Sequence, residues 1–154
     1  MVSRGDIYYI DLPIIGDDPQ GAELVGPHWH VVVSKNAIHE KLKIAILVPL
    51  TSLTNKDTGL EKDAGSFRLF RIRVHPAHIT WEKDAKNKFD KTGLAKTEQV
   101  RYMSIDRLGL KCGTLNDAGI AGINAGLADV LSIPVPQRRS PPSGPISPPL
   151  RFRD

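Results

Sequence analysis

Alternating apolar and polar positions predict several β-strands in the first half of the chain. Tyr8, Ile10 and Leu12 would share one face of a strand over residues 6–12. A second strand, rich in valine, is predicted over residues 29–34. Residues 44–50 are apolar at nearly every position, so both faces of this third strand should be buried and the strand should be central in its sheet.

The alternation changes phase within a predicted fourth strand, residues 67–74. Phe67 and Leu69 fall on one parity, whereas Ile72 and Val74 fall on the other. One extra residue near Leu69, forming a β-bulge, would restore the phase. The opposite face then carries Arg68, Arg71 and Arg73. Two interpretations stay open for these arginines: a solvated face paired with glutamates, or a stripe that follows the phosphates of a nucleic acid.

The second half of the chain predicts one more strand and one helix. Residues 76–92 carry mixed charge without a strand period, which indicates an extended loop or short helix, and a fifth strand is predicted over residues 93–100. Asn116 can cap a helix that ends near Leu131. Its apolar stripe, at helical spacing, is Ile120, Ile123, Leu127 and Val130. Three glycines weaken this helix but allow a close neighbour (Gly119, Gly122 and Gly126).

This order of elements predicts a mainly β protein with a C-terminal α-helix. We expect a small, SH3-like partial barrel of about five antiparallel strands, with the helix packed against it. A length of 154 residues agrees with one domain, which we place at residues 1–132. Residues 133–154 are rich in Pro, Ser and Arg, and we expect them to form a disordered tail.

Charge and cysteine content restrict the interpretation only modestly. The net charge of +4 is compatible with nucleic-acid binding, but most of this excess comes from the tail, which holds Arg138, Arg139, Arg151 and Arg153 against Asp154. The single cysteine, Cys112, forms no internal disulfide and is expected to be inert. No apolar run reaches the roughly 18 residues of a membrane span, and no signal peptide follows Met1. We therefore expect a cytoplasmic protein without a membrane segment.

The chain lacks the short motifs of well-known cofactor sites. It contains no P-loop, dinucleotide-binding turn, zinc finger or serine nucleophile elbow. His28, His30, His75 and His78 offer a zinc site as an alternative, although no cysteine or suitably spaced carboxylate accompanies them. The candidates for chemistry are therefore polar residues at the ends of strands, and no metal or other cofactor is expected.

Four segments, in the right order, resemble the MazF/PemK toxin family. They are the opening strand RGDIYYIDL (4–12), the loop and strand GAELVGPHWHVVVS (21–34), the strand end LVPLTS (47–52), and LAKTEQVR followed by SID (94–106). The similarity extends over about residues 4 to 131. It implies a homodimer whose interface forms a groove for single-stranded RNA, and cleavage without metal by the RNA's own 2′-hydroxyl. It also implies an acidic, partly disordered antitoxin protein that covers the groove.

The resemblance assigns roles to residues by position. The residues at the family's catalytic positions are His28 and Thr51, and Glu23 and Glu98 are at positions that help to bind or orient RNA. The other candidates for RNA binding are Trp29, Lys96, Gln99 and Arg101.

One position departs from the family in a way that changes the chemistry. The family turn Gly-x-Arg-Pro is Gly26-Pro27-His28-Trp29 in this chain. Arginine stays charged near neutral pH, whereas histidine can act as base, acid or cation. The missing charge could come from Lys96, Arg101 or the Arg68–Arg73 face.

Each of these residues also has a purely structural interpretation. His28 and His30 can be surface residues, Trp29 a core residue, Thr51 and Glu23 loop residues, and Lys96 and Glu98 partners of neighbouring strands. The alternative to an RNA-cleaving toxin is therefore a non-catalytic module of the same fold that binds RNA or a protein.

Overall fold

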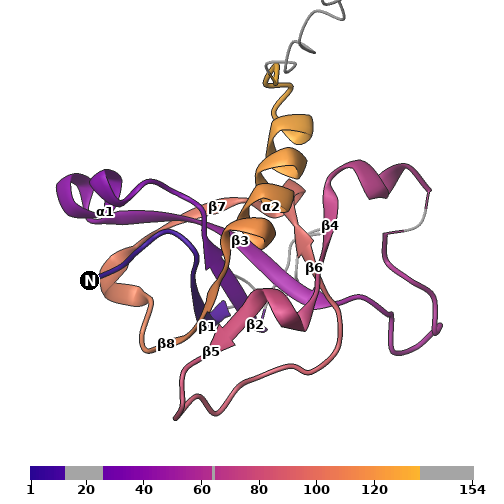
Figure 1. The fold of residues 1–154 in the computed structure, drawn as a ribbon, viewed down its shortest axis with the longest axis horizontal. Helices are drawn as coiled ribbons and strands as arrows, with labels where there is room; N and C mark the ends of the chain where they lie inside the picture. The colour runs from indigo at the N-terminus through magenta and orange to yellow at the C-terminus, as the bar shows by residue number, and fades with distance from the viewer. Residues whose placement is uncertain (13–25, 64, 136–154) are drawn as a thin grey trace, which may run out of the picture.

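A computed structural model describes residues 1–12, 26–63 and 65–135 and is built around a curled antiparallel sheet (Figure 1). Within these residues the strands follow the order β4-β6-β3-β2-β1-β8-β5, and β7 also pairs with β3. The strands are β1 (Asp6–Leu12), β2 (Gly26–Val32), β3 (Ile44–Ser52), β4 (Arg71–Val74), β5 (Ile79–Trp81), β6 (Gly93–Lys96), β7 (Arg101–Ser104) and β8 (Lys111–Leu115). The predicted mainly β class with a C-terminal helix is confirmed, with more and shorter strands than expected.

Strand β3 is central, as its apolar sequence predicts. It pairs with β2 along one edge, and along the other edge its first half pairs with β7 and its last residues with β6. Val48 and Leu50 pack into one hydrophobic cluster and Leu47 into a second, and all three side chains are fully buried. The sheet therefore has apolar contacts on both faces at this strand.

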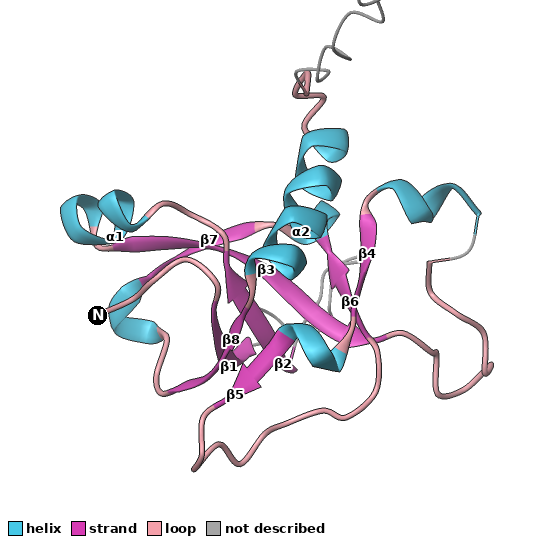
Figure 2. Ribbon diagram, viewed as in Figure 1, coloured by secondary structure: helices cyan, strands magenta, loops and turns pink. Residues whose placement is uncertain are grey.

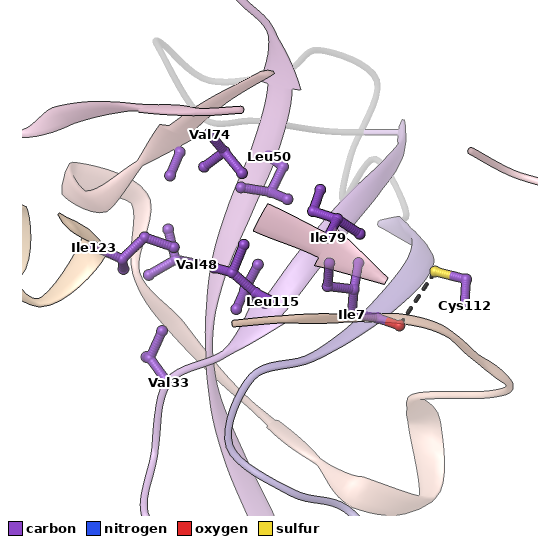
Figure 3. Packing of buried hydrophobic residues seen from close by; sticks show 11 residues of the cluster. Ile7, Val33, Val48, Leu50, Val74, Ile79, Cys112, Leu115 and Ile123 are labelled. Carbon is purple, nitrogen blue, oxygen red and sulfur yellow. Dashed lines mark hydrogen bonds between the residues drawn. The ribbon is translucent and has the colours of Figure 1, made fainter. Parts of the chain in front are cut away.

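The main core fills the space between the sheet and helix α2 (Asp117–Val130), which crosses one face of the sheet (Figures 1 and 2). Figure 3 shows Ile123 of this helix with Val48 and Leu50 of β3. Side chains from β1, β2, β3 and β7 form the second cluster, together with Leu108.

Helix α2 begins as the sequence predicts, and Ile120, Ile123 and Leu127 of its predicted stripe belong to or pack against the main core, whereas Val130 does not. The Asn116 side chain caps it by accepting a hydrogen bond from the Gly119 amide at 3.0 Å. A Cβ atom built on Gly126 would lie 2.7 Å from Ile72 Cγ1, and one on Gly119 would lie 2.5 Å from Leu115 Cδ1. These glycines therefore let the helix approach β4 and β8 more closely than alanine would.

Two predicted strands are shorter than expected. Residues 67–69 belong to a 3₁₀ helix (Gly65–Leu69), so the phase change marks a helical turn and not a bulge. The predicted fifth strand ends at Lys96 and is followed by a 3₁₀ turn (Thr97–Gln99) before β7. The cause is the buried Thr97, whose hydroxyl donates to the Phe70 carbonyl and turns the chain there.

Four elements other than the 3₁₀ turns were not predicted: helix α1 (Asn36–Leu42) and strands β5, β7 and β8. Strand β5 lies in the stretch expected to be a loop or helix, and it forms because Thr80 pairs with Thr114 of β8. Helix α1 is tied to the sheet by His39, whose Nδ1 lies 3.0 Å from the Val2 carbonyl. A carbonyl only accepts, so Nδ1 donates and Nε2 accepts from the Ser34 hydroxyl at 2.6 Å.

The second predicted strand, residues 29–34, is displaced: it begins at Gly26 and ends at Val32. Residues 133–135 have no regular structure, and residues 136–154 of the predicted tail lie outside the described residues. None of the helices in the described part of the chain is long and apolar enough to cross a membrane.

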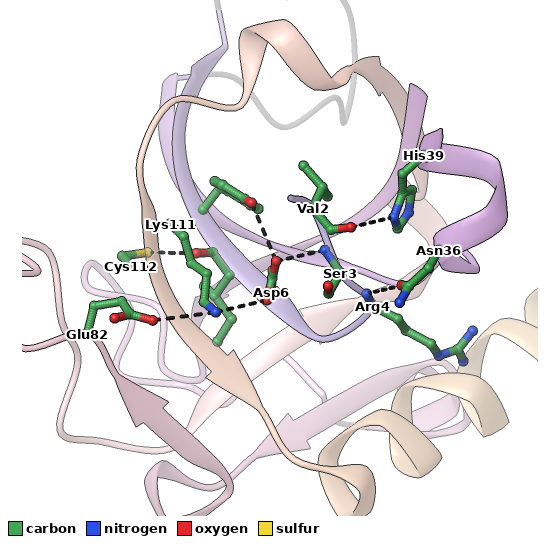
Figure 4. A network of polar contacts seen from close by, with 11 residues as sticks. Val2, Ser3, Arg4, Asp6, Asn36, His39, Glu82, Lys111 and Cys112 are labelled. Carbon is green, nitrogen blue, oxygen red and sulfur yellow. Dashed lines mark hydrogen bonds and ion pairs between the residues drawn. The ribbon is translucent and has the colours of Figure 1, made fainter. Parts of the chain in front are cut away.

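A polar network ties β1 to β8 (Figure 4). The buried carboxylate of Asp6 accepts from the Ser3 amide at 2.8 Å and forms an ion pair with Lys111 at 3.2 Å. The Cys112 thiol donates to the Ile7 carbonyl at 3.2 Å, and burial raises the pKa of this thiol to about 11. Cys112 is thus held as a neutral thiol, which fits the expected inert role.

Candidate active site

A cleft of about 610 Å³ opens where β2 begins and β3 ends. Trp29 pairs with Leu50, so His28 and Thr51 are the next residues along the same antiparallel ladder. Both line the cleft, and Trp29 lines it as well. Most of the other lining residues come from the end of β3, the loop after it and the segment before β6, and include Ser52, Lys56, Lys62, Asp90 and Lys91.

The loop after β3 folds back as a small hairpin. The Lys62 amide donates to the Leu53 carbonyl at 2.8 Å, and Thr54 and Glu61 form an isolated bridge. The Asn55 side chain closes the turn by accepting from the amides of residues 57 and 58 at 2.8 and 3.3 Å. The hairpin brings Lys62 alongside the strand end that it follows in sequence.

Lys62 is the functional candidate that the sequence did not reveal. Its Nζ lies 3.4 Å from Thr51 Oγ1 and 3.3 Å from Ser52 Oγ. Burial, followed by the positive charges of Lys56 and Arg71, lowers the pKa of Lys62 from its ordinary value. The sequence signal was the Asn55–Gly59 turn directly after the strand, which predicts a chain reversal but not which side chain returns to Thr51.

Trp29 belongs to an aromatic cluster at the wall of the cleft. Its ring meets Tyr9 and Phe89 edge to face, with centroids 5.2 and 5.1 Å apart, and Phe89 meets Trp81 at 5.1 Å. The indole Nε1 donates to the Asn87 carbonyl at 3.2 Å. Trp29 therefore anchors the segment 82–92 to β2, and it also lines the cleft. It thus combines a packing role with a position open to RNA, the two interpretations of this residue.

The two histidines of β2 have different environments. His28 is half-buried in the cleft wall. His30 is fully buried, which corrects its interpretation as a surface residue. His30 Nδ1 lies 2.9 Å from the His28 carbonyl, so it carries a proton and donates it. Burial lowers the pKa of His30 to about 4, against the opposing effect of this hydrogen bond, and Arg101 lowers it further. His30 is therefore neutral at pH 7.

The arginine face is largely occupied by carboxylates. Arg71 Nε lies 2.7 Å from Glu98 Oε1, and Arg73 pairs with Asp63 and Glu61, each at 2.7 Å. The glutamate-paired interpretation therefore describes Arg71 and Arg73. Glu98, a candidate for RNA binding, is a structural partner of Arg71 in this arrangement.

The remaining candidates are not brought into the cleft. Lys96 pairs with Arg71 across β6 and β4, and burial, followed by the charge of Arg71, lowers the pKa of Lys96. Gln99 and Arg101 are half-buried, beyond β6 and outside the cleft lining. Glu23 lies outside the described residues. The structure thus gathers His28, Trp29 and Thr51 at one site and leaves Lys96, Glu98, Gln99 and Arg101 to the side.

The four histidines of the alternative zinc site do not converge. His30 is enclosed in the sheet, and the rings of His75 and His78 lie 6.1 Å apart beside β5. Across the described ranges, no three His, Cys, Asp or Glu side chains are grouped in a way that could hold a metal ion.

Solved structures place this curled sheet with its single C-terminal helix in a known class of fold. An endoribonuclease in complex with its cognate antitoxin from a mycobacterial species is 20% identical, with a TM-score of 0.53, covering 88% of this chain and 100% of that chain. Mycobacterium tuberculosis toxin MazF-mt6 is 11% identical, with a TM-score of 0.54, covering 84% and 99%. MazF from Deinococcus radiodurans is 14% identical, with a TM-score of 0.54, covering 86% and 97%.

The sequence itself identifies the family. Residues 3–131 match the family described as PemK-like, MazF-like toxin of type II toxin-antitoxin system. The chain therefore belongs to the PemK/MazF toxin family, which confirms the resemblance found in the four sequence segments. None of the curated proteins compared with the chain matches it.

Proposed function

We propose that this protein is an endoribonuclease toxin that cleaves single-stranded RNA without a metal ion. The observation that carries the proposal is the cleft in which His28 and Thr51 lie at adjoining strand positions. Family membership supports it, and solved structures with this fold bear the name endoribonuclease. A cytoplasmic place of action is part of the proposal.

The chemistry requires three functions at one phosphate. A base takes the proton of the RNA 2′-hydroxyl, whose oxygen bonds to phosphorus as the bond from phosphorus to the 5′-oxygen breaks. An acid protonates that leaving oxygen, and donors stabilise the charge on the non-bridging oxygens. His28 takes the proton from the 2′-hydroxyl as base and passes it to the 5′-oxygen as acid, and the Thr51 hydroxyl donates to a non-bridging oxygen. The products are a 2′,3′-cyclic phosphate and a 5′-hydroxyl.

We further propose that the protein acts as a homodimer and is neutralised by an acidic antitoxin. Lys56, Lys62 and Lys91 line the cleft, and acidic segments are complementary to such a surface. Structures of this fold include MazE-MazF from Deinococcus radiodurans. Light scattering of the 16.9 kDa chain at micromolar concentration tests the dimer, and a uniform monomer would contradict it.

Mapping of RNA ends after incubation with the purified protein tests the proposed reaction. His28→Ala should lower the cleavage rate by roughly 10²–10⁴, the usual contribution of a positioned acid or base. Thr51→Ala should lower it less, because it removes one donor and leaves the proton carrier. A chelator should have no effect. RNA that binds in a gel-shift assay without being cut would favour the non-catalytic binding module.

A further inference from the structure

We propose that Lys62 supplies the positive charge at the scissile phosphate, in place of the arginine that the family turn carries and this chain replaces with His28. The inference rests on the proposed function, since it assigns a role within that same cleft. Its basis is the position of the Lys62 ammonium beside the hydroxyls of Thr51 and Ser52, in the cleft that His28 also lines.

The ammonium group has capacity for a ligand. It carries three N–H donors, and its two hydroxyl contacts, at 3.3 and 3.4 Å, are long for hydrogen bonds to a cation. Among the described residues no carboxylate lies within ion-pair distance of Lys62. A phosphate oxygen that accepts from both Lys62 and Thr51 would gain a short, charge-assisted bond in place of these long contacts.

The other proposed sources of charge are less well placed. Arg71 and Arg73 already form ion pairs at 2.7 Å with carboxylates. Lys96 and Arg101 do not line the cleft. Lys56 and Lys91 do line it but are exposed, whereas Lys62 is half-buried, where a charge interacts more strongly with an anion than it does in water.

The backbone at Lys62 is fixed from two sides. Its amide donates to the Leu53 carbonyl, and its carbonyl accepts from Arg71 Nη1, both at 2.8 Å. Arg71 is in turn held by Glu98. The backbone that carries the Lys62 side chain is therefore fixed before any ligand arrives, which reduces the reorganisation needed to place its charge at an anion. This also gives Glu98 an indirect positioning role.

Cleavage rates of Lys62 variants test the proposal. Lys62→Met should reduce the rate by roughly 10²–10³, the usual loss for one such donor, and Lys62→Arg should retain a large part of it. Lys41→Met, on the exposed surface of α1 and outside the cleft, is the control for loss of one positive charge. Thermal melting checks that each variant folds. If Lys62→Met does not fold, Lys62→Gln provides a second neutral variant.

The pH profile separates a charge on the phosphate from a structural role. The pKa of Lys62 is lowered from 10.5. As the pH rises, the ammonium should therefore lose its proton, and the wild-type cleavage rate should begin to fall, before pH 10.5 is reached. Arginine stays charged there, so Lys62→Arg should lack this limb. Background hydrolysis of the RNA is subtracted with a protein-free blank. If the wild-type protein cleaves RNA and Lys62→Arg loses rate at the same alkaline pH, the proposal is overturned.

Binding of inorganic phosphate gives a readout that does not depend on cleavage. Phosphate should shift the NMR amide signals of Thr51 and Ser52 in the wild-type protein and in Lys41→Met, and not in Lys62→Met. Equal shifts in Lys62→Met would overturn the role of Lys62, as would cleavage by that variant at the wild-type rate. A wild-type chain that cuts no RNA would refute the proposed function and, with it, the catalytic role of Lys62.

Discussion

Replacement of the buried His30 should change how the stability of the protein depends on pH. His30 is fully buried, and its pKa falls from 6.5 to about 4 on folding. Between these two values the unfolded chain binds a proton that the folded protein excludes. The contribution of His30 to the free energy of unfolding is therefore fully present above pH 6.5 and is lost as the pH drops towards 4. Below pH 4 this group causes no further loss.

The size of the effect follows from the same pKa difference. About 2.5 pKa units, at roughly 1.36 kcal/mol each, correspond to about 3 kcal/mol of unfolding free energy lost between pH 6.5 and 4. That is a large fraction of the roughly 5–15 kcal/mol typical of a folded domain. Asp63, whose pKa the Arg73 guanidinium holds below its ordinary 3.8, loses its contribution only at more acidic pH. The two effects therefore fall in different pH ranges.

Urea unfolding at a series of pH values between 7.5 and 4 measures this loss. His30→Asn keeps a donor for the His28 carbonyl but has no titrating group, so its slope with pH should be smaller by up to about 1.4 kcal/mol per pH unit. His75→Asn, at an exposed histidine, should keep the wild-type slope. Equal slopes for wild type and His30→Asn would refute the assignment of a buried, neutral His30.

Three further predictions concern other parts of the molecule. Phe89→Ala should lower the unfolding free energy by about 2 kcal/mol and change the fluorescence of the adjoining Trp29, because it empties the half-buried centre of the aromatic cluster. Gly126→Val should cost about 1–3 kcal/mol in thermal unfolding, because the new side chain meets Ile72 where a Cβ alone would lie 2.7 Å away. Removal of residues 133–154 should leave circular dichroism and any cleavage pattern unchanged, since that composition lacks the apolar residues of a core.

The elements that could be predicted are those long enough to show a regular spacing of apolar residues in the sequence. Strand β1 and helix α2 follow from alternation and helical spacing, and the Asn116 cap marks the start of the helix. Strand β5 could not be found this way, because three residues are too few for a period and the strand exists only through its pairing with β8. The 3₁₀ turn at Thr97 likewise depends on a distant acceptor, the Phe70 carbonyl.

The candidate site was predictable only where a motif defines it. His28 and Thr51 came from family positions, and strand pairing brings them into one cleft. Lys62 is part of no such motif, and its place depends on the length of the hairpin between two short segments of backbone pairing. Arg71 and Glu98 form an ion pair at 2.7 Å because the fold brings them together. Composition cannot show which arginine pairs with which carboxylate, so their roles could not be predicted.

The turn that departs from the family pattern is structurally coupled to residues 76–92. Trp29 stands where the family turn has a proline. The indole of Trp29 donates to the Asn87 carbonyl, and its ring packs on Phe89, which fixes this segment against the sheet. A proline at position 29 has no side-chain donor and could not make the bond to Asn87.

The consequence of this coupling reaches the cleft. Phe89 and the residues after it line the cleft together with the hairpin that carries Lys62. Asp90 and Lys91, next to the Trp29 anchor, therefore lie where an RNA strand in the cleft would meet them. A change at Trp29 thus alters which side chains line the cleft. The altered turn therefore affects two features together: the side chain at the proposed catalytic position, His28, and the shape of the cleft around it.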